Sequence, residues 1–356
     1  MKKFIVIVSG AVGGAEKRFF DVFRGLLEQG ENVFLVLPTC LLDVFQSENS
    51  LDKYSENIIS IELNHWSPIK FAYKFFKNVL CKSSSDDVFH YPLNPLFFLH
   101  FIKLRKFTMS LCHCYSTPKL SLKSKGLSLQ FVASFFAHKI DILNPIIFES
   151  FGKQLPKIQN KLFQTPGGTY IFPSTVAYQE KPRNFAFIGR LEKNKGLDVL
   201  FDLIPLIDEI EKNIAFHIYG DGSLKQYVES NVNELRSKNH NVNYHGYGKI
   251  SDVLNNTWCV FSLQTITNYP SRVVAESLLN GCEVIVLDSG DSCNFGDLEG
   301  IHYLSQNLTD LESIITEIKD RSSYLEIDKL KLISKSAQGQ FSSRDYISYF
   351  QKLFEH

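Results

Sequence analysis

A short loop in this sequence carries two cations that could bind a phosphorylated ligand. Arg190 and Lys195 lie in Gly189-Arg190-Leu191-Glu192-Lys193-Asn194-Lys195-Gly196, directly after an apolar segment. Two cations in such a loop can neutralise a diphosphate and stabilise it as a leaving group. The alternative is a solvated basic loop, and the position of the string at the end of a predicted buried strand argues against it.

A helix start lies further along the chain, in Thr267-Asn268-Tyr269-Pro270-Ser271-Arg272-Val273-Val274-Ala275-Glu276. Pro270 predicts the first turn of a helix, because its missing N–H would have no intrahelical partner there. Gly281 predicts the helix end, and residues 283–287 form an apolar strand.

An anion could bind at that helix start. The amides of Ser271, Arg272 and Val273 would point out of the helix, where the helix dipole favours negative charge. Glu276 follows one turn later and could turn toward the same pocket. A positive helix end with a carboxylate behind it suits a diphosphate joined to a ribose. The alternative is an ordinary crossover helix with a solvated Glu276.

Both stretches belong to a regular alternation of strands and helices. Predicted strands cover 3–8, 32–38, 57–63, 87–91, 107–114, 140–144 and 161–164, with helices at 15–28, 68–81, 94–104 and 127–138. The pattern restarts with strands at 185–188, 214–219, 242–245, 258–263 and 283–287, and helices at 196–212, 223–238, 250–256, 270–280, 307–321, 326–338 and 343–354. Such an alternation favours parallel sheets.

We therefore predict an α/β protein with two doubly wound, Rossmann-like domains. The first spans 1–172, the second spans 184–338, and a linker at 173–183 lies within a Pro- and Gly-rich stretch. Residues 339–356 form the last helical segment. Ligands of such sheets bind beyond the carboxyl ends of the strands, which is where the two stretches lie.

The charge of the chain is divided between its halves. Residues 1–183 carry 22 Lys and Arg against 14 Asp and Glu, a net +8, and residues 184–356 carry 16 against 24, a net −8. Most of the excess lies at 68–125, with ten basic residues against Asp86 and Asp87. This patch suits an anionic partner such as a lipid headgroup or a phosphorylated acceptor. The alternative is a solvated face.

One predicted helix in this patch has two faces. Phe71, Phe75 and Leu80 lie near one side, while Lys70, Lys74 and Lys77 follow another. The pattern is typical of helices that rest on membranes, and the alternative is a crossover helix packed on the sheet.

Other candidates are less specific. Gly13 and Gly14 follow the first strand and could allow close approach of a ligand or form a plain tight turn. His113 ends a predicted strand and could line a site or be structural, His90 is similar, and His217 in mid-strand is predicted to lie in the core. Seven Cys show no metal-binding spacing, which favours a reducing cytoplasm, and no apolar stretch approaches the ~20 residues that span a bilayer.

The motifs together resemble the GT-B-fold glycosyltransferases of the large retaining group called family 4. The resemblance covers nearly the whole chain and rests on six motifs in the family's order. They are Gly13-Gly14-Ala15-Glu16-Lys17-Arg18, Pro166-Gly167-Gly168, Gly189-Arg190-Leu191 with Lys195-Gly196, Tyr219-Gly220-Asp221-Gly222-Ser223, His245-Gly246-Tyr247, and an E-x7-E-like segment ending at Glu276. Asn268 stands where the family commonly has the first Glu.

The resemblance implies a fold, a reaction and a set of roles. It implies two domains facing a cleft, a last helix that crosses back to the first domain, and sugar transfer from a nucleotide diphosphate sugar to an acceptor hydroxyl with retention and without a metal or other cofactor. The implied enzyme is of hexosyltransferase type, cytoplasmic or peripheral on the inner face of the membrane, and active in cell-surface polysaccharide, lipopolysaccharide or capsule assembly on a lipid-linked or oligosaccharide acceptor. The roles would be Arg190 and Lys195 on the diphosphate, Glu276 on the ribose, Tyr247 and Gly248 at the base, Asn268 on the sugar, and His113, Gly13 and Gly14 lining the cleft.

Three alternatives remain open at this point. A nucleotide-sugar epimerase can share the fold, and a non-catalytic GT-B subunit is kept in view by Asn268. A dehydrogenase is disfavoured, because no acidic residue ends the second strand at Leu37-Pro38-Thr39. Nothing in the sequence indicates nucleic-acid binding.

Overall fold

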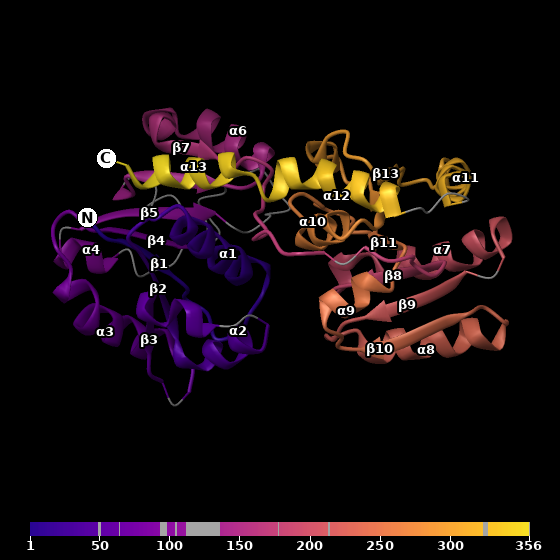
Figure 1. The fold of residues 1–356 in the computed structure, drawn as a ribbon, viewed down its shortest axis with the longest axis horizontal. Helices are drawn as coiled ribbons and strands as arrows, with labels where there is room; N and C mark the ends of the chain where they lie inside the picture. The colour runs from indigo at the N-terminus through magenta and orange to yellow at the C-terminus, as the bar shows by residue number, and fades with distance from the viewer. Residues whose placement is uncertain are drawn as a thin grey trace. The chain divides into compact units, whose positions relative to one another are not determined.

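The chain folds into two α/β units (Figure 1). The computed structural model describes residues 1–48, 51–63, 65–92, 98–103, 105–111, 136–176, 178–212, 214–322 and 327–355. Unit 1 comprises residues 1–172 and 343–356, and unit 2 comprises residues 173–342. Each is described separately below.

Unit 1 is built on a parallel sheet. The sheet order is β3-β2-β1-β4-β5-β6-β7. The strands are β1 (Lys3–Val6), β2 (Val33–Pro38), β3 (Ile58–Ile61), β4 (Val88–Pro92), β5 (Lys106–Leu111), β6 (Lys139–Ile142) and β7 (Leu162–Gln164). The helices are α1 (Gly14–Glu28), α2 (Leu42–Glu48), α3 (Pro68–Asn78), α4 (Leu99–Ile102), α6 (Pro145–Gln154) and α13 (Arg344–Phe354). Nearly every described residue of β1, β2 and β4 is buried, as expected for strands covered on both faces.

The last helix of the chain, α13, belongs to unit 1. Ser343 caps it by accepting a hydrogen bond from the Tyr346 amide at 3.4 Å. Its apolar stripe is buried against α1 and the sheet, and comprises Tyr346, Ile347, Phe350, Leu353 and Phe354. The two helices approach closely at Gly25, where a Cβ would lie 2.4 Å from Ile347 Cδ1.

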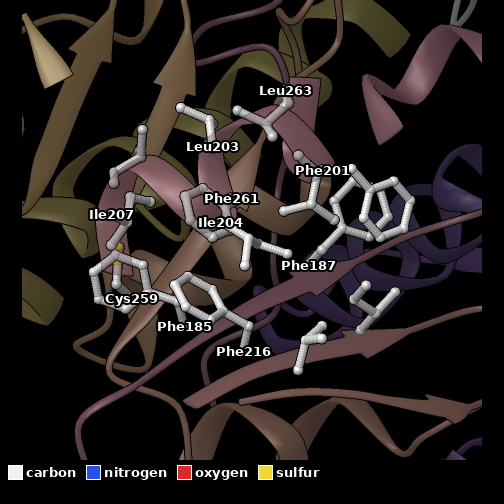
Figure 2. Close-up of a cluster of buried hydrophobic side chains, with 14 of the residues drawn as sticks. Phe185, Phe187, Phe201, Leu203, Ile204, Ile207, Phe216, Cys259, Phe261 and Leu263 are labelled. Atoms are coloured by element: carbon white, nitrogen blue, oxygen red, sulfur yellow. The ribbon is translucent and has the colours of Figure 1, made fainter. Parts of the chain in front are cut away.

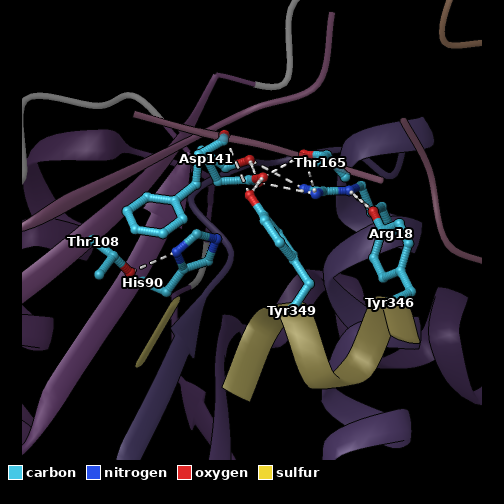
Figure 3. Close-up of polar contacts among 9 residues, drawn as sticks. Arg18, His90, Thr108, Asp141, Thr165, Tyr346 and Tyr349 are labelled. Carbon is cyan, nitrogen blue, oxygen red and sulfur yellow. Dashed lines mark hydrogen bonds and ion pairs between the residues drawn. The ribbon is translucent and has the colours of Figure 1, made fainter. Parts of the chain in front are cut away.

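A group of buried polar side chains lies beneath α13 (Figure 3). We call it the buried arginine network: Arg18, Ser110, Asp141, Thr165, Tyr346 and Tyr349. The Arg18 guanidinium donates to Asp141 Oδ2 at 2.9 Å and to Tyr346 Oη at 2.8 Å. Tyr349 Oη donates to Asp141 Oδ1 at 2.6 Å. The network therefore joins α1, β5, β6 and α13 through charge-assisted hydrogen bonds.

Unit 2 is built on a second parallel sheet of order β10-β9-β8-β11-β12-β13. Its strands are β8 (Asn184–Ile188), β9 (Ala215–Tyr219), β10 (Val242–Gly246), β11 (Cys259–Ser262), β12 (Glu283–Leu287) and β13 (Ile301–Leu304). Its helices are α7 (Leu197–Ile210), α8 (Lys225–Ser237), α9 (Ile250–Asn255), α10 (Arg272–Leu279), α11 (Leu311–Ser322) and α12 (Ile327–Phe341). Figure 2 shows the larger core of this unit, where Phe185, Phe216 and Phe261 from three strands meet Ile204 and Ile207 of α7.

The predicted fold class is confirmed: both sheets are parallel and Rossmann-like. Several boundaries differ from the prediction. Of the helix predicted at 94–104, the structure describes residues 98–103, and within these α4 spans Leu99–Ile102. Helix α2 between β2 and β3 escaped prediction, because its seven residues are too few for a clear periodic pattern.

Candidate functional site

The candidate site lies in unit 2 where the strand order reverses. The chain runs outward from β8 through β9 to β10, and then returns to place β11 on the other side of β8. In doubly wound sheets this reversal leaves a crevice at the carboxyl ends of the two central strands. The loops that follow β8 and β11 are residues 189–196 and 263–271, so both stretches singled out by the sequence lie at this position.

Glycine packing fixes the first of these loops against its neighbours. Gly196 has φ 72°, and a Cβ there would lie 1.9 Å from the Leu263 carbonyl oxygen at the end of β11. Gly220, with φ 148°, would place a Cβ 1.8 Å from the Gly189 oxygen. Only glycine permits either contact, and together they hold the loop after β8 against the ends of β9 and β11.

A chain of hydrogen bonds connects Lys195, in the loop after β8, to the buried part of the loop after β11. Lys195 Nζ donates to Gln264 Oε1 at 2.7 Å, and Gln264 Nε2 donates to Asn268 Oδ1 at 3.1 Å. We call Lys195, Gln264 and Asn268 the lysine relay. Lys195 and Gln264 are partly exposed while Asn268 is buried, so the relay anchors an accessible cation to the sheet.

Asn268 has all four hydrogen-bonding positions of its amide occupied by the protein. Its oxygen also accepts from Ser262 Oγ at 2.8 Å. Its nitrogen donates to the backbone oxygens of Ser262 at 2.6 Å and Leu287 at 3.3 Å. A side-chain amide offers two donors and two acceptor positions, so none is left for a ligand. The predicted contact of Asn268 with a donor sugar is therefore revised: in this structure the amide ties the loop to the ends of β11 and β12.

The helix start differs from the prediction by two residues. Pro270 lies outside the helix, after a cis peptide bond, and α10 begins at Arg272 with Ser271 as its N-cap. The predicted first turn at Pro270 is wrong because the proline belongs to the loop. The amides of Arg272 and Val273 remain in the first helical turn, where they have no intrahelical acceptor. The anion-favouring helix end is therefore present at this position.

Glu276 faces back along the same helix. Its Oε1 accepts from Arg272 Nε at 2.8 Å, and the two side chains are 14% and 16% exposed. Its position one turn into α10 places it close to the helix start, as the sequence predicted.

Asp291, after β12, is a supporting residue that the sequence did not single out. Its carboxylate accepts from the backbone N–H of Asn268 at 2.9 Å, from Thr267 Oγ1 at 2.5 Å and from Ser289 Oγ at 2.8 Å. It fixes the loop that carries Asn268. Gln264 was missed in the same way. Gln264 follows β11 and Asp291 follows the neighbouring β12, and this position after a strand's carboxyl end is the signal that could have found them.

The remaining predicted residues of unit 2 lie on the surface of its loops. Arg190 is exposed, one residue beyond Gly189. Tyr247 follows β10 and is 79% exposed. Gly248 packs against Tyr219, and a Cβ at Gly248 would lie 3.0 Å from Tyr219 Cδ1. The structure thus places Arg190, Tyr247 and Gly248 on loops at the carboxyl edge of the sheet.

In unit 1, Gly13 and Gly14 are exposed at the start of α1. The Gly13 amide donates to Glu16 Oε2 at 2.8 Å, which closes the helix start. His113 lies outside the described residues. His90 is fully buried in β4, with Nδ1 2.7 Å from Thr108 Oγ1. Burial lowers the pKa of His90 to about 3, a shift that the nearby Asp141 carboxylate opposes and Arg18 supports.

The core position predicted for His217 is wrong. Its ring is partly exposed on the face of β9, with Nδ1 2.9 Å from Nε2 of His245 on β10. Partial burial lowers the pKa of both rings. Among the described residues, no three His, Cys, Asp or Glu side chains are grouped so as to hold a metal ion. No helix in that part of the chain is long and apolar enough to cross a membrane.

Comparison with protein families gives one match. The family described as Glycosyl transferases group 1 matches residues 182–318, which include the whole candidate site. The match covers less than half of the chain. No curated protein matches the sequence.

Solved structures match over the whole length. HepE of Anabaena, in complex with UDP and glucose, has a TM-score of 0.71 at 15% identity, covering 99% of this chain and 98% of its own. A TarM variant of S. aureus, in complex with fondaparinux, α-GlcNAc-glycerol and UDP, has a TM-score of 0.74 at 12% identity, covering 100% of both chains. A glycosyltransferase of Rickettsia africae has a TM-score of 0.65 at 16% identity, covering 99% and 97%. The fold is that of the GT-B glycosyltransferases, and with the family match it supports a GT-B glycosyltransferase.

Proposed function

We propose that this chain transfers a sugar from a nucleoside diphosphate sugar to an acceptor hydroxyl, and that the donor binds at the candidate site of unit 2. The observation that carries the proposal is the hydrogen bond between Lys195 and Gln264, which joins the loops after β8 and β11 where the strand order reverses. It ties a cation to the loop that leads into α10, within the residues that match the glycosyltransferase family. A fixed cation and a helix start are the groups that stabilise a departing diphosphate.

Each residue of the site has a role in this reaction. Lys195 and Arg190 hold the diphosphate, helped by the amides of Arg272 and Val273. Glu276 holds the ribose, and the loop of Tyr247 and Gly248 meets the base. Asn268 acts through Gln264 on Lys195 and is a positioning residue.

The chemistry is a substitution at the anomeric carbon of the donor. The acceptor oxygen forms a bond to that carbon, the bond to the diphosphate oxygen breaks, and its electron pair leaves with the diphosphate. The acceptor proton passes to the leaving group or to solvent. Charge grows on the diphosphate as the bond breaks, so cations fixed beforehand lower the barrier. Retention of configuration, a hexosyl donor and a reaction without a metal are parts of the proposal that rest on the family resemblance.

The acceptor is proposed from unit 1. Gly13, Gly14 and His113 would line its site, and a lipid-linked or oligosaccharide acceptor in cell-surface polysaccharide assembly would suit the basic excess at 68–125. The HepE and TarM structures are complexes that include UDP, so we choose UDP as the first nucleotide to test on this chain.

Two measurements test the proposal. Calorimetric titration with UDP, GDP and ADP should identify one nucleotide that binds, and Lys195→Ala should weaken that binding about tenfold or more, as expected when a charge-assisted contact is lost. Lys193→Ala, an exposed cation two residues away, is the matched control and should bind normally.

Product analysis then separates the candidate functions. Incubation with the matching nucleotide sugars and acceptor sugars should yield a glycoside, with EDTA making no difference. An altered sugar nucleotide without acceptor would indicate an epimerase. Nucleotide binding without any product over a broad acceptor panel would indicate a non-catalytic subunit, and equal binding by Lys195→Ala would place the donor elsewhere.

A further inference from the structure

Helix α3 presents the opposite face to solvent from the one expected. Phe71, Phe75 and Leu80, predicted to face a membrane, are fully buried against the sheet of unit 1. Phe71 and Phe75 stack on each other, and Phe75 meets Phe89 of β4 edge to face. The amphipathic pattern is therefore explained by the core: α3 is a crossover helix packed on the sheet, which is the alternative that the sequence left open.

The exposed side of α3 nevertheless carries two apolar side chains, Ile69 and Tyr73, which we call the crest of the helix. Ile69 is 81% exposed and Tyr73 is 66% exposed. At 3.6 residues per turn these two side chains lie within roughly 40° of each other, on the side of the helix directly away from Phe71 and Phe75. Folding gains nothing from them there, because neither packs against the core.

Lysines flank this crest. Helix α3 contains Lys70, Lys74 and Lys77 and no acidic residue. Lys70 and Lys77 are exposed, and by the helical period they lie beside Tyr73 on one flank. Lys74 is turned aside, since its Nζ donates to the Glu62 carbonyl oxygen at 2.6 Å. A purely solvated helix face would show its polar side chains at the crest and its apolar ones toward the core.

Helix α4 adds to the same side of the sheet. Leu99 of α4 and Phe76 of α3 pack on the same core cluster, so both helices cover one face of unit 1. Ile102 and Phe98 are 66% and 49% exposed. Lys103 follows directly. Apolar side chains among cations thus recur on the next helix.

We propose that the exposed face of α3, with Ile69 and Tyr73 at its crest and Lys70 and Lys77 beside them, docks unit 1 onto a bilayer that contains anionic lipid. The lysines would meet lipid phosphates, and the two apolar side chains would enter the interface between headgroups and acyl chains. The charge of the face selects an anionic surface, and the apolar crest selects a bilayer over a soluble anion. The proposal is independent of the sugar-transfer reaction, since lipid binding needs neither donor nor acceptor.

Co-sedimentation with vesicles tests the proposal. The full chain should sediment with vesicles of phosphatidylcholine and phosphatidylglycerol, and not with pure phosphatidylcholine. Binding should fall as salt is raised, because salt screens the lysines. Each lysine near an anionic surface is worth about fivefold in affinity, so Lys70→Glu with Lys77→Glu should weaken binding by about 25-fold or more.

Two further double variants make the test specific. Ile69→Ser with Tyr73→Ser should weaken binding while leaving its salt dependence in place, because the charges remain. The control for net charge is Lys331→Glu with Lys335→Glu, which removes two exposed lysines from α12 of unit 2. This variant should bind the anionic vesicles normally. Circular dichroism should be the same for all variants, since every changed side chain is exposed.

Three results would overturn the proposal. They are equal sedimentation with neutral vesicles, unchanged binding in both α3 double variants, and an equal loss in the α12 control. Concentration-dependent self-association that disappears in Ile69→Ser with Tyr73→Ser would instead assign the crest to a second copy of the chain.

Discussion

Each unit holds a cation with a group of polar side chains, and the two groups differ in how far they exclude water. In the buried arginine network, Arg18 and Asp141 are 1% and 0% exposed, and the Arg18 guanidinium donates to the side chains of Ser110, Asp141 and Tyr346. In the lysine relay, only Asn268 is buried, and Lys195 stands at the edge of the sheet.

The difference shows what each group can do. A buried ion pair has strong internal contacts but loses its hydration, so its removal is costly and its presence fixes structure. The network accordingly lies between α1, the sheet and α13. Although burial alone would raise the pKa of the Asp141 carboxyl, Arg18 and the surrounding hydroxyl groups hold it below the ordinary value. A cation that is anchored but still accessible costs less to hold and can meet a ligand.

The comparison predicts the largest loss of stability when α13 is removed. Truncation after Ser342 deletes five buried side chains, each worth about 1.5–3 kcal/mol, against a total stability of about 5–15 kcal/mol for a typical domain. Residues 1–172 should lose protection from hydrogen exchange while unit 2 keeps it. Removing only residues 355–356 is the control. Full protection of 1–172 in the truncated chain would show that α13 does not hold the unit together.

Arg18→Met should have the next largest effect. It leaves the Asp141 carboxylate buried without its cation, at a cost of about 3–5 kcal/mol in the free energy of unfolding of unit 1. The exposed pair of Lys238 and Glu234 is the control, where Lys238→Met should cost at most about 1 kcal/mol. Replacing Asp141 by Leu as well should recover part of the loss. Urea denaturation measures all three, and equal costs for Arg18→Met and Lys238→Met would contradict the comparison.

Lys195→Ala should show the reverse pattern, with a large effect on rate and a small one on stability. If the proposed reaction holds, losing one fixed charge at the leaving group should slow turnover by about 10²-fold. The midpoint of urea unfolding should stay almost unchanged, because Lys195 is partly exposed. Arg190→Ala should behave likewise. A stability loss as large as that of Arg18→Met would make the relay a structural group.

Acid should weaken unit 1 through His90. Its folded pKa of about 3 lies below the ordinary 6.5, so its contribution to stability is full above pH 6.5 and is lost as pH falls toward 3. The slope contributed is up to about 1.4 kcal/mol per pH unit. His90→Gln can still bond Thr108 and should flatten the curve between pH 6 and pH 4, measured by urea unfolding as the difference from the unmodified chain. Parallel curves would exclude His90 as the source.

Gln264→Ala should have the smallest effect. It removes the link between Lys195 and Asn268 without touching either, so the cation remains but is less well placed. We expect a loss of about tenfold in turnover, the cost of one hydrogen bond to a charged group. Gln226→Ala, on the exposed side of α8, is the control. A loss equal to that of Lys195→Ala would mean that Gln264 itself contacts the ligand.

The sequence by itself determined strands β8 to β12 of unit 2 and the loops that carry the site, whereas β13 at Ile301–Leu304 was not predicted. The run 283–287 was predicted to the residue, because continuous apolar stretches between helical patterns have one stable placement in a parallel sheet. The same argument put Lys195 and residues 267–276 at the carboxyl edge. The last helix was predicted at 343–354, within one residue of α13.

Tertiary structure alone decided which side chains are available. Asn268 and Gln264 are both amides on one loop, and only the packing shows that Asn268 is enclosed by the ends of β11 and β12. The partner of Arg18 lies 123 residues away, at Asp141, beyond the reach of any local pattern. On α3, periodicity separated two faces but could not say which one the sheet would cover. The sheet covered Phe71 and Phe75, because these rings, packed on each other and edge to face against Phe89 of β4, bury more apolar area than Ile69 and Tyr73 could from the opposite side.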